Sequence, residues 1–259
     1  MSKEISTKNF FSQDSVKKKF EELLGKNSKG FITSVLQVTT TNNLLAKADP
    51  KTVYSSAMMA AILNLPINNN LGFAWIVPYK GQAQFEMVWR GFVQLAHRTG
   101  EYKSINVIEV YENQFVKFDK LTEEFTHRLD KDPEGEIIGY VGRFELNNGF
   151  SKTVYWNSKK VQEHAKKYSQ SYGMKSSPWT LHFDEMAKKT VLKNMLSKYG
   201  PLSLEMQNAV ISDQAVINDA ETIDVDYVDG TNEDTPSVQS VEEKKKEMQE
   251  EGPKHEPLP

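Results

Sequence analysis

The segment 137–156, with the sequence IIGYVGRFELNNGFSKTVYW, carries the strongest hairpin signal in the chain. Two apolar stretches, 137–146 and 150–156, flank Asn147-Asn148-Gly149. An Asn-Gly pair between such stretches readily adopts the positive φ angles that tight hairpin turns require. The segment therefore predicts two antiparallel strands and, with them, an antiparallel sheet.

Strand signals continue on both sides of this hairpin. An apolar stretch, 71–78, and an alternating one, 84–89, flank the turn-like residues 79–82. This arrangement predicts a second hairpin. Further strands are expected at 105–111, 115–118 and 126–129.

Helical segments separate and follow these strands. Asp49-Pro50 supplies an N-cap and a first-turn proline before 51–63. The apolar segment 30–40 is a further helix candidate, although its β-branched residues weaken that signal. The remaining predicted helices are 14–24, 90–98, 159–169, 180–198 and 203–210. The order of helix, hairpin, helix, meander and helix predicts an α+β fold, in which helices pack on an antiparallel sheet with hairpins.

The composition describes a chain that can bury a core in one domain. Hydrophobic residues make up 38% of the 259 residues, and there is no cysteine, which excludes disulfides and thiolate metal sites. No apolar run reaches the ~20 residues that span a bilayer. The first 15 residues lack the apolar core of a signal peptide. We therefore expect a soluble, cytoplasmic protein with no membrane partner, in which residues 1–12 are loose.

Charge is divided unevenly along the chain. Residues 213–259 hold 14 Asp and Glu against four Lys, a net charge of −10, whereas residues 1–212 hold 28 Lys and Arg against 21 Asp and Glu, a net charge of +7. This division predicts a basic core, 1–212, and an acidic, largely disordered tail, 213–259. Charge alone fits a polyanion-binding domain and an ordinary domain with a solubilising tail about equally well.

The predicted helix 180–198 concentrates lysines. Lys189 and Lys193 lie four residues apart on one helical face, and Lys188 is adjacent to them. Such a cluster is a candidate phosphate-binding ridge. Taken alone, the helix is better interpreted as a solvated basic face.

Motifs for catalysis are weak. The sequence has no G-x-x-x-x-G-K-S/T loop, no G-x-G-x-x-G loop and no H-E-x-x-H pair. Nothing in it therefore calls for ATP. A Ser-His-Asp triad stays open, but no nucleophile elbow supports one. A nuclease would need clustered carboxylates for Mg²⁺, and Glu134 and Glu136 are a poor candidate. A duplex-binding protein would need a helix-turn-helix, and none is evident.

Basic residues instead alternate with aromatic ones. The pairs are Tyr79-Lys80, Trp89-Arg90, Tyr102-Lys103, Lys117-Phe118 and Lys167-Tyr168. Single-strand binding grooves combine cations for phosphates with aromatic faces for bases. Each aromatic residue taken singly is more often part of the core. Together with the +7 body, however, the pattern favours nucleic acid as the partner.

Two sets of residues resemble the RecT family of bacteriophage recombinases. The first is Leu71–Tyr79 followed by Trp89–Gly100, with its Trp-Arg-Gly start and Leu-Ala-His-Arg-Thr-Gly end; the second is Pro178-Trp179 with Glu185–Thr190. The likeness extends over about residues 15–212. Thr99 stands where the family usually has Ser, and Asn194 stands where a second basic residue is expected.

The resemblance implies a single-strand annealing protein, not an enzyme, of bacteriophage homologous recombination in a bacterial host cell. Such proteins bind single-stranded DNA and the annealed duplex intermediate as rings or helical filaments. They require no cofactor, with Mg²⁺ expected at most to modulate DNA binding. A phage exonuclease and the host single-strand-binding protein are the implied protein partners.

Seven basic residues are the predicted DNA contacts. They are Lys188, Lys189, Lys193, Arg90 and Arg98, followed by Lys80 and Lys103 as second choices. For Arg90, pairing with a core carboxylate is an equal alternative.

Overall fold

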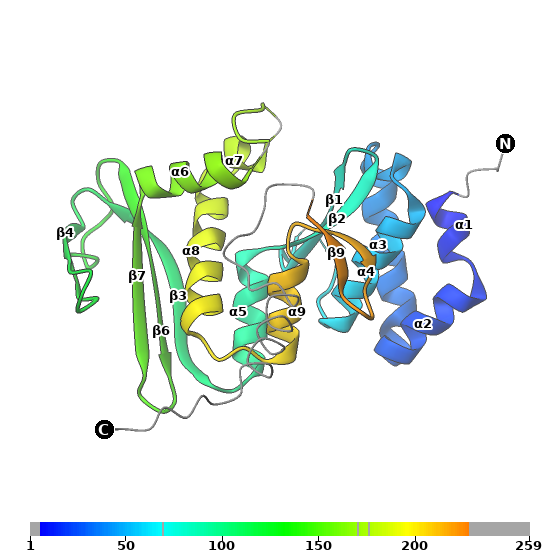
Figure 1. Cartoon of the computed structure of the whole chain (residues 1–259), viewed down its shortest axis with the longest axis horizontal. Coiled ribbons are helices and arrows are strands. Elements are labelled where there is room, and N and C mark those ends of the chain that lie inside the picture. The colour runs from blue at the N-terminus through cyan, green and yellow to red at the C-terminus, as the bar shows by residue number, and fades with distance from the viewer. Residues whose placement is uncertain (1–5, 69, 170, 176, 228–259) are drawn as a thin grey trace, which may run out of the picture.

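A computed structural model of the chain describes residues 6–68, 70–169, 171–175 and 177–227. A three-stranded sheet stands at one end of the molecule, and the N-terminal helices stand at the other (Figure 1). Helices α5 (Trp89–Arg98), α8 (Phe183–Tyr199) and α9 (Leu204–Ser212) lie between the two ends. The predicted α+β class is confirmed.

The sheet forms where the sequence places its strongest hairpin. Strands β3 (Tyr102–Tyr111), β6 (Ile137–Leu146) and β7 (Ser151–Asn157) are antiparallel in the order β3-β6-β7. Residues 145 and 151 pair across the turn, where Gly149 has a φ of 89°. The predicted Asn-Gly hairpin is therefore confirmed.

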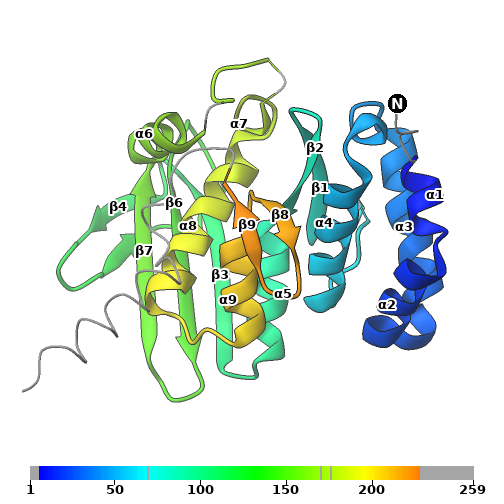
Figure 2. The same ribbon diagram turned by 45° about the vertical axis from the view of Figure 1, so that its right-hand side comes forward.

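Helix α8 crosses one face of this sheet (Figure 2). The helix approaches β6 closely at Gly142, where an added Cβ would lie 3.3 Å from side-chain atoms of Val191 and Met195. A larger residue at 142 would push α8 away from the sheet.

A small hairpin covers part of the opposite face. Strands β4 (Phe115–Phe118) and β5 (Phe125–His127) pack their aromatic rings against Tyr155 of β7, with centroid separations of 5.1–5.7 Å. Helix α6 (Ser158–Tyr168) follows β7 directly. The Asn157 side chain caps α6 by accepting from the Lys160 N–H at 2.8 Å.

The second predicted hairpin is also confirmed. Strands β1 (Ala74–Tyr79) and β2 (Gln82–Met87) are joined by Lys80-Gly81, with φ angles of 46° and 82°. Two positive φ values in a two-residue loop match the twist of a hairpin. Helix α4 (Pro50–Ile62), capped by Asp49 as predicted, packs on β2.

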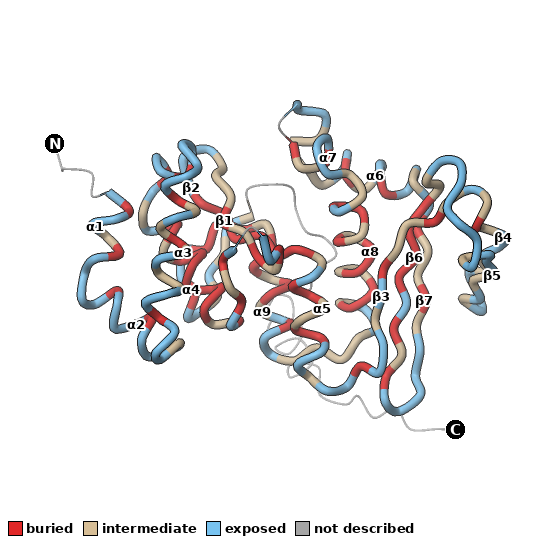
Figure 3. The backbone as a smooth tube through the Cα atoms, turned by 180° about the vertical axis from the view of Figure 1, so that it is seen from behind, coloured by how far each residue is buried: buried red, intermediate tan, exposed pale blue. Residues whose placement is uncertain are grey.

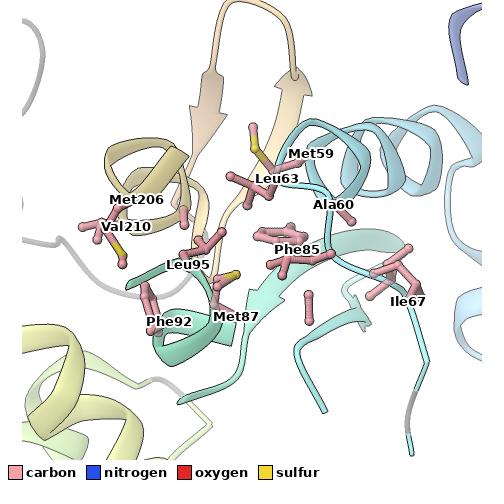
Figure 4. Close-up of a cluster of buried hydrophobic side chains, with 14 of the residues drawn as sticks. Met59, Ala60, Leu63, Ile67, Phe85, Met87, Phe92, Leu95, Met206 and Val210 are labelled. Carbon is pink, nitrogen blue, oxygen red and sulfur yellow. The ribbon is translucent and has the colours of Figure 1, made fainter. Parts of the chain in front are cut away.

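The core is continuous between these elements. Side chains of α4, β2, α5 and α9 meet in one buried cluster (Figure 4), and buried positions extend from there into the β3-β6-β7 sheet (Figure 3). Gly91 of α5 lets that helix approach Phe73, because an added Cβ would lie 2.2 Å from the Phe73 carbonyl oxygen. The glycine of the Trp-Arg-Gly sequence is therefore required by the close packing of α5 on Phe73.

The N-terminal end differs from the prediction of a loose segment. Residues Thr7–Phe11 form α1, and the fully buried Phe11 ring stacks on Phe20 of α2 (Asp14–Leu24) at 5.9 Å. Short 3₁₀ turns at Gly25–Asn27 and Leu45–Lys47 flank α3 (Ser28–Thr41). Burial of Phe11 orders this segment, an effect that its polar composition hid. Residues 1–5 lie outside the described part.

The C-terminal boundary also differs. Residues beyond 212 continue into β8 (Val216–Asp219) and β9 (Asp224–Asp226), and Ala215 and Ile217 are fully buried. The structured core therefore extends to residue 227 rather than 212, because this hairpin adds apolar side chains to the core. The rest of the predicted disordered tail, 228–259, lies outside the described residues.

The helix predicted at 180–198 is divided in two. Residues Pro178–Leu181 form the short α7, and α8 begins at Phe183. His182 between them has φ −142° and ψ 50°, which is not helical.

Candidate nucleic-acid interface

Two of the three lysines predicted to form a ridge lie in a buried ion cluster. Lys189 Nζ lies 2.9 Å from Asp213 Oδ1 and 3.1 Å from Glu86 Oε1, and Lys193 Nζ lies 2.9 Å from Asp213 Oδ2. The side chain of Lys189 is 6% exposed and that of Asp213 is 0% exposed. We call Glu86, Lys189, Lys193 and Asp213 the ion cluster. Their pairing corrects the expectation of an open lysine ridge.

The ion cluster joins three parts of the chain. The Met87 N–H also donates to Asp213 Oδ1 at 2.9 Å, so one carboxylate connects β2, α8 and the segment after α9. Burial by itself would raise the pKa of Asp213, but the charges of Lys189 and Lys193 outweigh it and hold that pKa below its ordinary value. In turn, the carboxylates of Asp213 and Glu86 raise the pKa of Lys189 against the effect of its own burial.

Lys188 is paired as well. Its Nζ lies 2.9 Å from Glu109 Oε1 and 2.6 Å from Glu185 Oε1. The Trp89 indole N–H donates to the other oxygen of Glu185 at 2.6 Å. Burial lowers the pKa of Lys188, but its hydrogen bonds and attraction to Glu185 and Glu109 outweigh this and leave it raised. These contacts hold α8 to β3 and to the start of α5.

The other four predicted contacts lie in different places. Arg98 donates to the carbonyl groups of Leu63 and Asn64 at 2.6 and 2.7 Å, which neutralises the C-terminal end of α4. Lys103 pairs with Glu145 at 2.6 Å on the sheet. The structure does not bring these seven residues together in one surface, and whether each contacts DNA remains a prediction.

Arg90 and Lys80 are exposed beside aromatic rings. The Arg90 guanidinium lies 5.5 Å from the Trp89 ring centre, and Lys80 Nζ lies 4.9 Å from that of Tyr79 at the β1–β2 turn. Arg90 has no carboxylate within salt-bridge distance among the described residues, but its charge helps to lower the pKa of Glu185.

A different set of lysines lines a hollow at the far end of α8. This hollow lies between β7, the start of α6, the end of α8 and β4, and we call it the lysine hollow. Its charged and polar members are Lys120, Glu123, Lys152, Thr153, Asn157, Lys160, Asn194 and Lys198. Its aromatic members are Phe115, Phe118, Tyr155, Trp156 and Tyr199. Four lysines against one glutamate leave a net charge of +3 at this site.

Cations and rings are in direct contact there. Lys152 Nζ lies 3.4 Å from the ring centre of Tyr199, and Lys160 Nζ lies 3.9 Å from that of Trp156. Lys152 also pairs with Glu123, while Lys120, Lys160 and Lys198 are exposed. The hollow adjoins a second one between α6 and α8, because Asn194 lines both. Concave, cationic and aromatic, the site has the features by which proteins hold single-stranded nucleic acid.

The sequence contained a signal for this site. Lys198-Tyr199 is a basic-aromatic pair of the same kind as those counted above, and Lys152 precedes Tyr155-Trp156 by only a few residues. Because Gly200 follows it, the pair Lys198-Tyr199 is readily interpreted as the end of a helix and not as part of a binding site. The assembly of these residues depends on β7 and α8 lying side by side, which spacing along the chain does not reveal.

Comparison with known proteins identifies the family of the chain. The model of the RecT family matches residues 29–227. The Bacillus subtilis (strain 168) protein YqaK, itself uncharacterised, is 45% identical over 243 residues, which cover 91% of this chain and 84% of YqaK. Protein RecT of Escherichia coli (strain K12) is 25% identical over 218 residues, 79% of each chain. The chain therefore belongs to the RecT family, a family of DNA-annealing recombination proteins.

The residues that the family model matches include the β8–β9 hairpin. None of the helices in the described part is long and apolar enough to cross a membrane.

Proposed function

We propose that this protein anneals complementary single strands of DNA without ATP and that it binds them through the lysine hollow. The observation that carries the proposal is the net positive, aromatic-lined hollow in a RecT-family chain. Annealing needs the repulsion between two phosphate backbones to be neutralised while the bases stay available for pairing. Lysines at the rim serve the first requirement, and aromatic rings that orient bases serve the second.

The protein acts as an oligomer in this proposal. One hollow holds only a few nucleotides, so a ring or helical filament of many copies would place such hollows in a continuous row along the strand. A phage exonuclease would expose the strands, and the protein would engage the host single-strand-binding protein as a partner. No covalent step is involved, and Mg²⁺ would act only on the strength of DNA binding.

Mixing two labelled complementary oligonucleotides in EDTA, with no nucleotide added, tests this function. We expect the protein to accelerate the appearance of duplex fluorescence over the spontaneous rate. Electron micrographs of the same mixture should show rings or filaments. A strict requirement for ATP, or shortening of the oligonucleotides, would contradict the proposal.

The site within the protein is tested separately. Replacing Lys120, Lys160 and Lys198 together by Ala should slow annealing while leaving thermal unfolding nearly unchanged, because all three side chains are exposed. A triple variant of exposed lysines on the distant N-terminal helices (Lys18, Lys26 and Lys29) removes the same charge and serves as the control. Equal slowing by both variants would mean that total charge, and not the lysine hollow, is responsible.

A further inference from the structure

Tyr199 is unusual among the tyrosines of this fold. It is the last residue of α8 and lies in the lysine hollow with 44% of its surface exposed. Tyr140, by contrast, is buried and donates its hydroxyl to Asp184 at 2.5 Å. For the Tyr199 hydroxyl, the described residues provide no hydrogen-bond partner. Neither burial nor hydrogen bonding therefore accounts for an aromatic residue at position 199.

The Tyr199 ring is nevertheless held in place. Lys152 Nζ lies over it at 3.4 Å from the ring centre, and Lys152 is itself only 13% exposed and paired with Glu123. The cation thus covers one face of the ring and is anchored from β7. A ring that is fixed in this way loses little conformational freedom when a ligand packs on it.

The surroundings fit a nucleotide. Exposed Lys198 is adjacent in the chain, and exposed Lys120 lines the same hollow, so cations surround an exposed aromatic surface. A nucleobase has a π-face that stacks on such a ring, while its phosphates attract the lysines. An acidic peptide would pair with the lysines but would have no group that stacks on the Tyr199 ring.

We propose that Tyr199 is a base-stacking site, in which a nucleobase of the bound strand packs on the ring that Lys152 holds from the other side. The inference rests on the proposed function and adds a specific contact to it. Stacking is tolerant of sequence, so Tyr199 would hold any base and leave its pairing edge free for a second strand. This is the property that annealing between arbitrary sequences demands.

Two substitutions of Tyr199 distinguish base stacking from a purely structural role of its ring. Tyr199→Phe keeps the ring, and Tyr199→Leu keeps an apolar side chain but removes the π-face. We expect Tyr199→Leu to bind an oligo-dT strand about fivefold or more weakly, whereas Tyr199→Phe binds like the wild type. On an abasic phosphodiester of the same length, all three proteins should bind alike, because no base is present. Phe150→Leu, which alters a 48% exposed aromatic outside the hollow, is the matched control.

The outcomes are distinguishable. If the wild type binds neither ligand, the proposed function fails. If the wild type binds oligo-dT and Tyr199→Leu binds it equally well, or loses affinity equally for the abasic strand, the stacking site is wrong and the function survives.

A second measurement applies if Tyr199→Leu does not fold. Oligonucleotides with 5-iododeoxyuridine cross-link on irradiation to aromatic side chains that stack on the base. With the wild-type protein we expect the cross-linked peptide to contain Tyr199. Cross-linking only at other residues would overturn the proposal.

Discussion

The ion cluster and the lysine hollow both include residues of α8, yet their lysines differ in burial and in the groups that they contact. Lys189 and Lys193 point into the protein and meet Asp213, which has no exposed surface. Lys198, between one and three turns further along the helix, is exposed and lines a hollow with aromatic rings. One group joins elements of the fold, and the other faces solvent beside a surface suited to DNA.

This comparison shows that lysine spacing on a helix does not reveal whether the charges are available. An ammonium group that is buried must be paired, since desolvation costs several kcal/mol. The same α8 sequence therefore supplies a structural connection where β2 and the segment after α9 cover it. Where neither covers it, the helix contributes to a cationic hollow. Four predictions test this division.

Removing residues 213–259 should have the largest effect. This truncation deletes Asp213 together with buried Val216 and Ile217, each of which contributes about 1.5–3 kcal/mol. The loss approaches the usual total stability of a domain, ~5–15 kcal/mol. We expect a chain ending at 212 to be unfolded or aggregated, as judged by circular dichroism and urea denaturation.

A chain ending at 227 is the control for that truncation. It removes only residues outside the described structure and should unfold at the wild-type temperature. It should also bind DNA at least as tightly, because nine acidic and four basic residues leave with the tail. Loss of annealing in this shorter chain would mean that residues 228–259 take part in forming the oligomer.

Asp213→Ala should be the most damaging single change at the ion cluster. It leaves the ammonium of Lys189 buried without its closest partner, a loss of about 3–5 kcal/mol. Asp224→Ala, an exposed change in the nearby β8–β9 hairpin, is the matched control and should change the free energy of unfolding little. Urea titration gives the free energy of unfolding of both variants. Similar values for the two would contradict the structural role of Asp213 in the ion cluster.

DNA affinity should distinguish the lysine hollow from lysines elsewhere on the molecule. Lys160→Ala with Lys198→Ala should flatten the slope of log K against log salt by ~0.7 for each lost phosphate contact. Lys103→Ala with Lys188→Ala removes the same charge from lysines held by Glu145, Glu109 and Glu185. We expect a smaller change for the second pair, and the reverse result would favour the predicted contacts Lys103 and Lys188 over the lysine hollow.

The smallest effect concerns pH. The lowered pKa of Asp213 means that its contribution to stability is complete above ~3.9 and is lost as the pH falls through the folded-state value. The raised pKa of Lys189 means that its contribution is complete below ~10.4 and is lost at higher pH. The difference in melting temperature between wild type and Asp213→Asn should therefore be constant from about pH 5 to 9. A change within that window would show that Lys189, left with Glu86 alone in the variant, or another group titrates there.

Local chemistry made much of the fold predictable. The Asn-Gly and Lys-Gly turns, the Asp49-Pro50 cap and the Trp-Arg-Gly helix start depend on neighbouring residues, so the hairpins, α4 and α5 form where the sequence places them. The family resemblance likewise came from contiguous motifs. These features need no knowledge of which elements pack together.

Long-range packing accounts for what the sequence left open. Asp213 looks like the start of an acidic tail, and only its contact with α8 and β2 makes it a buried anchor. Lys152 and Tyr199 are 47 positions apart in the numbering and meet only because β7 and α8 lie together. A charged or aromatic side chain takes its role from the partners and the solvent around it, and those are set by the assembled structure.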